Sequence, residues 1–327
     1  MTRRLRALAA ALALAATAFA ATGCGGDAAS ADASTSGKVT LTIGDQAKSL
    51  QTLLNASGAL DGTSYKVKWA EFEGAAPLFQ ALQAGAADTS YAADLPTLQA
   101  QSGGVPVKGV AALHNDGTAV GIVVQKNSAV KSVADLKGKK VVVSSAKGSI
   151  AEYLLANALQ QAGLKYSDVT VQYLLPTDAQ AAFTAGKIDA WATFGVYKAV
   201  AVQQGGRQII DGTDGRVSGY GFIGASDKAL ADAGRKAAIK DFLLRLDKAL
   251  TWSGTHQAAY AQAIEKASGA KAAVAALIVK QSYGELVPIT PAVTKAVQSV
   301  ADTMHGIKVL DPNVDVATSV DTSLYEG

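Results

Sequence analysis

The sequence LQAGAADTSYAAD, residues 82–94, is repeated in outline by FTAGKIDAWATFG, residues 183–195. In each segment a helical run ends at Ala-Gly, an Asp follows three residues after the Gly, and an apolar or aromatic stretch leads into a polar loop. Asp88 and Asp189 are 101 residues apart, whereas short solenoid repeats have periods of about 20 to 50 residues. The sequence therefore predicts that a whole lobe is duplicated.

Strand and helix patterns alternate around both segments. Residues 38–44 and 65–72 alternate apolar and polar positions ahead of the first segment, and residues 139–145 and 169–175 predict strands ahead of the second. A helical pattern follows each of these strands. Such alternation implies parallel crossovers with helices on both sheet faces. The predicted fold class is α/β, with two lobes that are each a mixed sheet flanked by helices.

The predicted lobes are interleaved in the chain. After about residue 212 the sequence becomes mainly helical, and these helices need a sheet to cover. We expect the chain to cross back near residues 215–221, so that two connecting strands form a hinge. The first lobe is then predicted to comprise residues 38–122 and 220–327, and the second lobe residues 123–219.

The N-terminus has the pattern of an export signal. Residues 1–23 begin with several arginines, continue with an apolar stretch and end in small residues. Cys24, the one cysteine of the chain, follows in ATGC, which resembles the bacterial lipobox and implies that Cys24 is acylated. Residues 24–37 are small and polar and predict a flexible tether. We expect a lipid-anchored protein on the extracytoplasmic face of the membrane, without disulfides.

The charge balance argues against a nucleic-acid partner. The chain has 30 Lys and Arg against 27 Asp and Glu, and Arg3, Arg4 and Arg6 lie in the predicted leader. Removal of the leader balances the charges, so no basic surface for nucleic acid is expected.

The sequence also lacks the usual marks of catalysis. Its three histidines are scattered, and it contains no zinc-ligand spacing, nucleophile elbow or phosphate-binding glycine loop. We expect no metal, no cofactor and no catalysis. An extracellular enzyme is kept as the less favoured alternative.

Two long segments carry a family resemblance. VADLKGKKVVVSSAKGSIAEYLLANALQQAGL, residues 133–164, and LLPTDAQAAFTAGKIDAWATFGVYKAV, residues 174–200, are similar to the aliphatic sulfonate-binding receptors of ABC importers. The resemblance extends over about residues 38–312. It implies the type II periplasmic-binding-protein fold and the capture of a small organic anion by hinge closure. It also implies permease subunits as partners and a monomeric receptor.

The same family includes receptors for taurine, nitrate and pyrimidine or thiamine precursors, and these remain alternatives. Sulfonate receptors commonly have Trp-Asp-Pro-Tyr after the second copy's strand, where this chain has Phe194, Gly195, Val196 and Tyr197. Gly195 therefore replaces an aspartate, which allows for an altered ligand.

The segment SSAKGSIAEYLL, residues 144–155, is the strongest candidate for an anion site, because it leads from a predicted strand into a helix. Ser149 is at the predicted N-cap and Gly148 allows a close approach of the backbone. Lys147 would attract a negative ligand. The alternatives are that Ser149 only caps its own helix and that Lys147 is only solvated.

Five other residues complete the predicted ligand site. Glu73 and Asp94, in first-lobe loops, would receive the ammonium group of a zwitterion such as taurine, or else stabilise turns. Phe194 and Tyr197 are predicted to contact an alkyl chain. Gln46 resembles the polar contact that sulfonate receptors make from their first loop.

Overall fold

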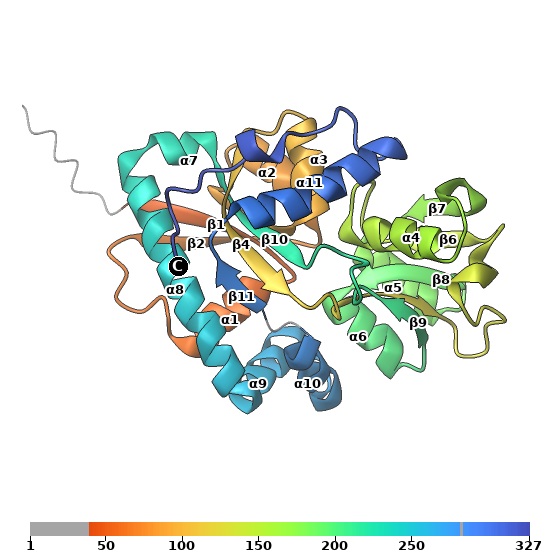
Figure 1. Ribbon diagram of the computed structural model, residues 1–327. Helices are drawn as coiled ribbons and strands as arrows, with labels where there is room; N and C mark the ends of the chain where they lie inside the picture. The colour runs from red at the N-terminus through yellow and green to blue at the C-terminus, as the bar shows by residue number, and fades with distance from the viewer. Residues whose placement is uncertain (1–38, 282–283) are drawn as a thin grey trace, which may run out of the picture. The chain divides into compact units, whose positions relative to one another are not determined.

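The computed structural model describes residues 39–281 and 284–327. The predicted signal peptide, the tether and Cys24 all lie outside these residues. Residues 38–327 belong to one unit of the chain, which contains two β-sheets with helices around each (Figure 1). The predicted α/β class with two mixed sheets is confirmed.

The first sheet has six strands in the order β11-β4-β10-β3-β1-β2. β1 pairs in parallel with β2 and β3, whereas β10 is antiparallel to β3 and β4, and β11 is antiparallel to β4. The strands are β1 (Thr40–Gln46), β2 (Lys66–Phe72), β3 (Thr89–Ala93), β4 (Val107–Asn115), β10 (Tyr220–Ser226) and β11 (Gly284–Val287).

The second sheet repeats this topology without the edge strand β11. Its order is β7-β6-β8-β5-β9, in which β6 is parallel to β7 and β8 while β5 is antiparallel to β8 and β9. In each sheet, the strand that the chain enters from the other half, β10 or β5, runs antiparallel to both of its neighbours. The strands are β5 (Val120–Val124), β6 (Lys140–Val143), β7 (Thr170–Tyr173), β8 (Ala190–Phe194) and β9 (Arg207–Asp211).

Eleven α-helices are described within residues 39–281 and 284–327, and none of them is long and apolar enough to span a membrane. They are α1 (Ser49–Ser57), α2 (Ala75–Gln83), α3 (Asp94–Ser102), α4 (Ile150–Gln161), α5 (Pro176–Thr184), α6 (Gly195–Gln203), α7 (Asp227–Ala231), α8 (Ala233–Thr255), α9 (Gln257–Ser268), α10 (Ala272–Gln281) and α11 (Pro291–Gly306). Short 3₁₀ helices occupy Val133–Leu136, Tyr166–Asp168 and Val316–Thr318.

The predicted duplication is confirmed in the unit helix–strand–helix. α2, β3 and α3 begin and end 101 residues before α5, β8 and α6, respectively. Gly85 and Gly186 end the first helix of each copy with φ of 73° and 69°, a backbone conformation that glycine adopts without strain. Their N–H groups donate to Leu82 at 3.0 Å and to Phe183 at 2.9 Å. The two copies therefore share one local geometry.

Apolar side chains of each sheet pack under its own helices. Leu41, Ile43 and Leu54 are fully buried with Phe242 of α8 beside the first sheet. In the second sheet Trp191 is fully buried and contacts Phe183, with 5.5 Å between the ring centroids. Another cluster contains side chains from both sheets, together with α4 and α11. The two halves are therefore packed against each other as well as connected.

The chain passes between the sheets twice, at residues 116–119 and 212–219. The two passes touch, because a Cβ atom on Gly117 would lie 2.5 Å from the carbonyl oxygen of Gly212. The second pass overlaps the crossing predicted at residues 215–221. The lobe boundary predicted after residue 122 falls inside β5, after the third residue of that strand.

Candidate functional site

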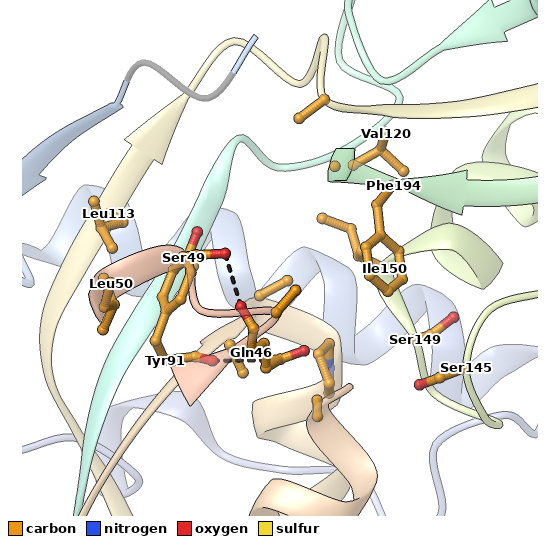
Figure 2. A pocket seen from close by; sticks show the side chains of 18 of the residues that line it. Gln46, Ser49, Leu50, Tyr91, Leu113, Val120, Ser145, Ser149, Ile150 and Phe194 are labelled. Atoms are coloured by element: carbon orange, nitrogen blue, oxygen red, sulfur yellow. Dashed lines mark hydrogen bonds between the residues drawn. The ribbon is translucent and has the colours of Figure 1, made fainter. Parts of the chain in front are cut away.

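A cavity of about 460 Å³ is lined by residues of both sheets and their helices (Figure 2). The loops that follow β1, β2 and β6 reach it, and so do the helix starts that directly follow β3 and β8, as expected for a ligand site at the carboxyl ends of parallel strands. Ser145 and Ser149 lie on the opposite side of the view from Leu50 and Leu113 (Figure 2). The cavity thus has a polar end and an apolar end.

The polar end is formed by the loop before α4. Ser149 is the N-cap, and its Oγ accepts the N–H of Glu152 at 3.3 Å, so the predicted cap is confirmed. Gly148 has φ of 81°, and a Cβ atom there would lie 2.7 Å from the side chain of Gln99. Glycine is therefore the residue that lets this loop pass close to α3.

The N–H of Gly148 does not point to a ligand, because Glu152 accepts it. Oε2 of Glu152 lies 2.6 Å from that nitrogen, and Oε1 accepts the hydroxyls of Tyr166 at 2.5 Å and Tyr173 at 2.6 Å. Glu152 is fully buried. The start of α4 is therefore less positive than the sequence alone suggests.

The start of α2 faces this loop from the first sheet. Gly74 is its N-cap, with no side-chain cap and no acidic residue in the first turn. A Cβ atom on Gly74 would lie 2.8 Å from Oγ of Ser145, and both Ala75 and Ala76 line the cavity. The first N–H groups of a helix have no partner within it, so α2 presents a positive end to the cavity. The sequence predicted a helix here, but its start was not singled out as an anion site because it lacks a Ser, Thr or Asp cap.

The starts of α1 and α3 already hold carboxylates. Asp45 accepts the N–H groups of Gln46 at 2.7 Å, Leu50 at 3.0 Å and Gln51 at 2.9 Å, and burial raises its pKa to about 7. Asp94 accepts the N–H of Leu95 at 2.6 Å. These two helix ends are therefore less available to an anion.

Asp94 lies apart from the other predicted ligand residues. Its side chain is fully buried, does not line the cavity and accepts the hydroxyl of Ser218, which belongs to the second pass between the sheets. Burial raises the pKa of Asp94 to about 6. A cavity ligand with an ammonium group would not reach this carboxylate directly.

The remaining predicted residues all line the cavity. Nε2 of Gln46 donates to the carbonyl of Tyr91 at 2.7 Å. Oε2 of Glu73 accepts the hydroxyl of Thr177, at the start of α5, at 2.6 Å. Phe194 and Tyr197 meet edge to face, with 6.4 Å between the ring centroids.

Lys147 lines the cavity, but its ammonium group is engaged elsewhere. Its Nζ donates to the carbonyl of Lys308, after α11, at 3.0 Å. Together with the bond between Glu73 and Thr177, this contact joins elements of the first and second halves. Both bonds lie at exposed side chains.

The apolar end continues as an arm between α1, α8 and α9, which the sequence reasoning did not anticipate. The sequence does show the apolar faces of these helices. Helical periodicity, however, does not tell whether an apolar face packs against a neighbour or lines a cavity. Its apolar lining side chains are almost completely buried from solvent: Leu50, Leu53, Leu113, Leu250, Tyr260 and Ile264.

Residues 66–257 match the model of the family described as NMT1/THI5 like. The chain belongs to the NMT1/THI5-like family. A protein of Escherichia coli (strain K12), named as an aliphatic sulfonates-binding protein, is 32% identical over 87% of this chain and 89% of its own length.

Solved structures of similar fold include the alkanesulfonate-binding protein SsuA from Xanthomonas axonopodis pv. citri bound to MOPS. It is 30% identical, with a TM-score of 0.81 over 86% of this chain and 98% of that chain. The desulfurization enzyme DSZB has the same fold at 15% identity, with a TM-score of 0.62 over 88% of this chain and 97% of its own. The fold of this family therefore also occurs in an enzyme.

The part matched by the NMT1/THI5-like family contains the polar end of the cavity but only part of the apolar arm. Ser145, Ser149 and the start of α2 lie within residues 66–257, whereas Leu50 and Ile264 lie outside them. The arm is thus partly built by segments beyond the family match.

Proposed function

We propose that the protein is the extracytoplasmic solute-binding receptor of an ABC importer and that it captures an aliphatic sulfonate between its two halves. The observation that carries the proposal is one cavity with a polar end at two helix starts and an apolar arm. The similar proteins named for sulfonate or alkanesulfonate binding support the same ligand class. A receptor of this kind binds its ligand without chemical change.

The sulfonate group is proposed to lie between the start of α2 and the serines of the facing loop. A sulfonate carries a single negative charge, which the positive end of α2 favours. The hydroxyls of Ser145 and Ser149 line the same space and have protons to donate. No arginine is needed in this arrangement, because backbone N–H groups and hydroxyls supply the donors.

The organic part of the ligand is proposed to extend past Phe194 and Tyr197 into the apolar arm. Burial of apolar surface favours binding by about 25 cal/mol per Å². The SsuA structure bound to MOPS supports a ligand with an acid head and a bulky organic tail, since MOPS is a propanesulfonate with a ring at its far end. A ligand of similar length would use both ends of this cavity.

Closure about the two passes between the sheets is proposed to seal the ligand from water. The bond between Glu73 and Thr177 and that between Lys147 and Lys308 would then hold the two halves together. The closed receptor would meet the permease subunits with surfaces from both halves. We further propose that acylated Cys24 anchors a monomeric receptor to the membrane.

The alternative ligands fit the cavity less well. Taurine brings an ammonium group, and Glu73 is the one carboxylate among the described residues that line the cavity. That carboxylate already accepts a hydrogen bond from Thr177. Nitrate would leave the apolar arm unfilled.

Titration calorimetry of the mature protein with butanesulfonate, taurine and nitrate tests the proposal. We expect butanesulfonate to bind most tightly, and Ser145→Ala combined with Ser149→Ala to weaken it by about tenfold or more through the lost hydrogen bonds. Ser299→Ala, on an exposed position of α11, is the matched control and should bind like the wild type. Unchanged affinity in the double variant, with folding verified by circular dichroism, would contradict the proposed head site.

The arm is tested in the same experiment with sulfonates of increasing chain length. Affinity should rise with each added methylene until the arm is filled, by up to about 0.8 kcal/mol per group. Ile264→Trp should remove this gain while leaving ethanesulfonate binding unchanged. A gain that persists in the variant would mean that the chain lies elsewhere.

A further inference from the structure

Glu152 is a buried carboxylate directly behind the polar end of the cavity. Its side chain has no solvent exposure, yet its Oε2 lies only 2.6 Å from the backbone nitrogen of Gly148, a residue that lines the cavity. Its own N–H donates to Oγ of Ser149. The carboxylate is therefore one hydrogen bond behind the wall that a bound acid group would touch.

The carboxylate of Glu152 is surrounded by neutral hydrogen-bond donors. The carboxylate accepts hydrogen bonds from Gly148, Tyr166 and Tyr173, and an ionised carboxylate is an acceptor at both oxygens. None of the ion pairs found within residues 39–281 and 284–327 involves Glu152. Because its hydrogen-bond partners are neutral, they do not cancel its negative charge, and the negative potential of the carboxylate extends to the cavity wall.

We propose that Glu152 sets the charge selectivity of the receptor, so that a head group with one negative charge is accepted and one with two is rejected. The inference rests on the proposed function, because it requires the acid group to lie at Ser145 and Ser149. It goes beyond that function by distinguishing sulfonates from phosphonates, whose head groups have the same tetrahedral shape.

Electrostatics at this distance are large enough to discriminate. An acid oxygen in van der Waals contact with the backbone of Gly148 would lie about 6 Å from the carboxylate, one hydrogen bond and one contact distance away. Repulsion between charges at that separation in a protein interior changes affinity by tenfold or more. Among the described residues, two lysines line the cavity, Lys48 and Lys147. The ammonium group of Lys147 is bonded to Lys308, and Lys48 lies beside the carboxylate of Glu71, which accepts its N–H at 3.0 Å. The attraction at the polar end therefore comes mainly from the helix ends. A second charge on the ligand thus adds repulsion without adding donors.

The test compares butanesulfonate with butylphosphonate by calorimetry at about pH 8.5, where the phosphonate carries two charges. The wild type should bind the sulfonate at least about tenfold more tightly than the phosphonate. Glu152→Gln keeps the shape and removes the charge, so it should lower this ratio by about tenfold, chiefly through tighter phosphonate binding.

Two further variants separate charge from loop anchoring. Tyr166→Phe combined with Tyr173→Phe removes two donors to Glu152 but leaves its charge, so the ratio should stay at the wild-type value or rise. Glu326→Gln changes the net charge equally at an exposed residue that does not line the cavity, and it should leave the ratio unchanged. Equal loss of selectivity in the tyrosine variant and in Glu152→Gln would overturn the proposal, because loosening of the loop would then be the cause.

The wild type alone provides a test that does not depend on the folding of any variant. If it binds sulfonate and phosphonate with equal affinity, the inference is overturned while the proposed function stands. If it binds neither, the proposed function fails and this inference fails with it.

Discussion

The two copies of the helix–strand–helix unit have the same boundaries but very different side-chain chemistry. α2–β3–α3 of the first half and α5–β8–α6 of the second are offset by 101 residues at every boundary. At the same place in the strand, however, the first copy has Ser90 and the second has the fully buried Trp191. At the strand end, buried Asp94 corresponds to Gly195, which lines the cavity.

This difference shows that the two copies keep the same backbone geometry although their side chains have different roles. The glycine that ends each first helix is kept because its positive φ is required in both copies. Positions whose side chains meet different neighbours diverge, since the packing around them differs. The motif that recurs in the sequence is therefore the structural part, and the functional part lies in the residues that do not recur.

The largest effect is expected at the position of Trp191. Trp191→Ala should lower the free energy of unfolding by about 3 to 5 kcal/mol, because it removes a fully buried ring and the hydrogen bond from Nε1 to Oγ of Ser144, 2.9 Å long. The matched change Ser90→Ala should cost less than about 1 kcal/mol. Urea unfolding of both variants measures the two losses in free energy of unfolding. Equal losses would contradict the predicted difference between the copies.

The second prediction concerns the pH dependence of stability. The pKa of Asp94 is raised to about 6 in the folded state, so the native protein holds this proton more tightly than the unfolded chain. The resulting stabilisation is full below about pH 4 and is lost as the pH rises through 6, with an upper limit of about 3 kcal/mol. Asp94→Asn should lack this loss.

Urea unfolding of wild type and Asp94→Asn at several pH values between 4 and 8 measures the loss of stability that is due to Asp94. Gly195→Asn, at the matching position of the second copy, removes no titrating group and should keep the wild-type slope. The prediction fails if wild type and Asp94→Asn change in parallel over this range.

A smaller effect is expected at the aspartate of the repeat itself. Asp88 accepts the N–H of Thr42 at 2.8 Å and forms an ion pair with Arg235 at 3.3 Å, whereas the side chain of Asp189 is exposed. Asp88→Ala should cost about 1 to 3 kcal/mol, because a partly buried N–H loses its acceptor. Asp189→Ala should stay within about 0.5 kcal/mol of the wild type. Thermal unfolding of the two variants tests this prediction. Similar shifts in melting temperature would mean that both aspartates have the same role.

Much of the fold was predictable because it depends on local patterns. The alternation of strands and helices and the repeat at Asp88 and Asp189 were sufficient for two α/β lobes. The edge strand β11 was not predicted, since four residues after a helical stretch give little periodicity. The start of the second sheet was placed three residues late, because the buried strand β5 has no polar position to mark its beginning.

The site was predictable only where a local signal coincides with the cavity. Ser149 could be identified as an N-cap from its neighbours, and it lines the cavity. The role of Glu152 could not be foreseen, because it depends on Tyr166 and Tyr173, which other elements bring to it. The burial of Asp94 under the second pass between the sheets is likewise a long-range feature.

The double passage of the chain between the sheets also has a consequence for the order of assembly. All strands of the second sheet lie within residues 120–211, whereas the first sheet needs β10 and β11 from the last third of the chain. During synthesis from the N-terminus, the second sheet would be complete before the first one. Strands β1 to β4 would by then be synthesised, but β10, which lies between β3 and β4, would still be missing. Until β10 arrives, the unpaired edges of β3 and β4 are the surfaces that most need protection from aggregation.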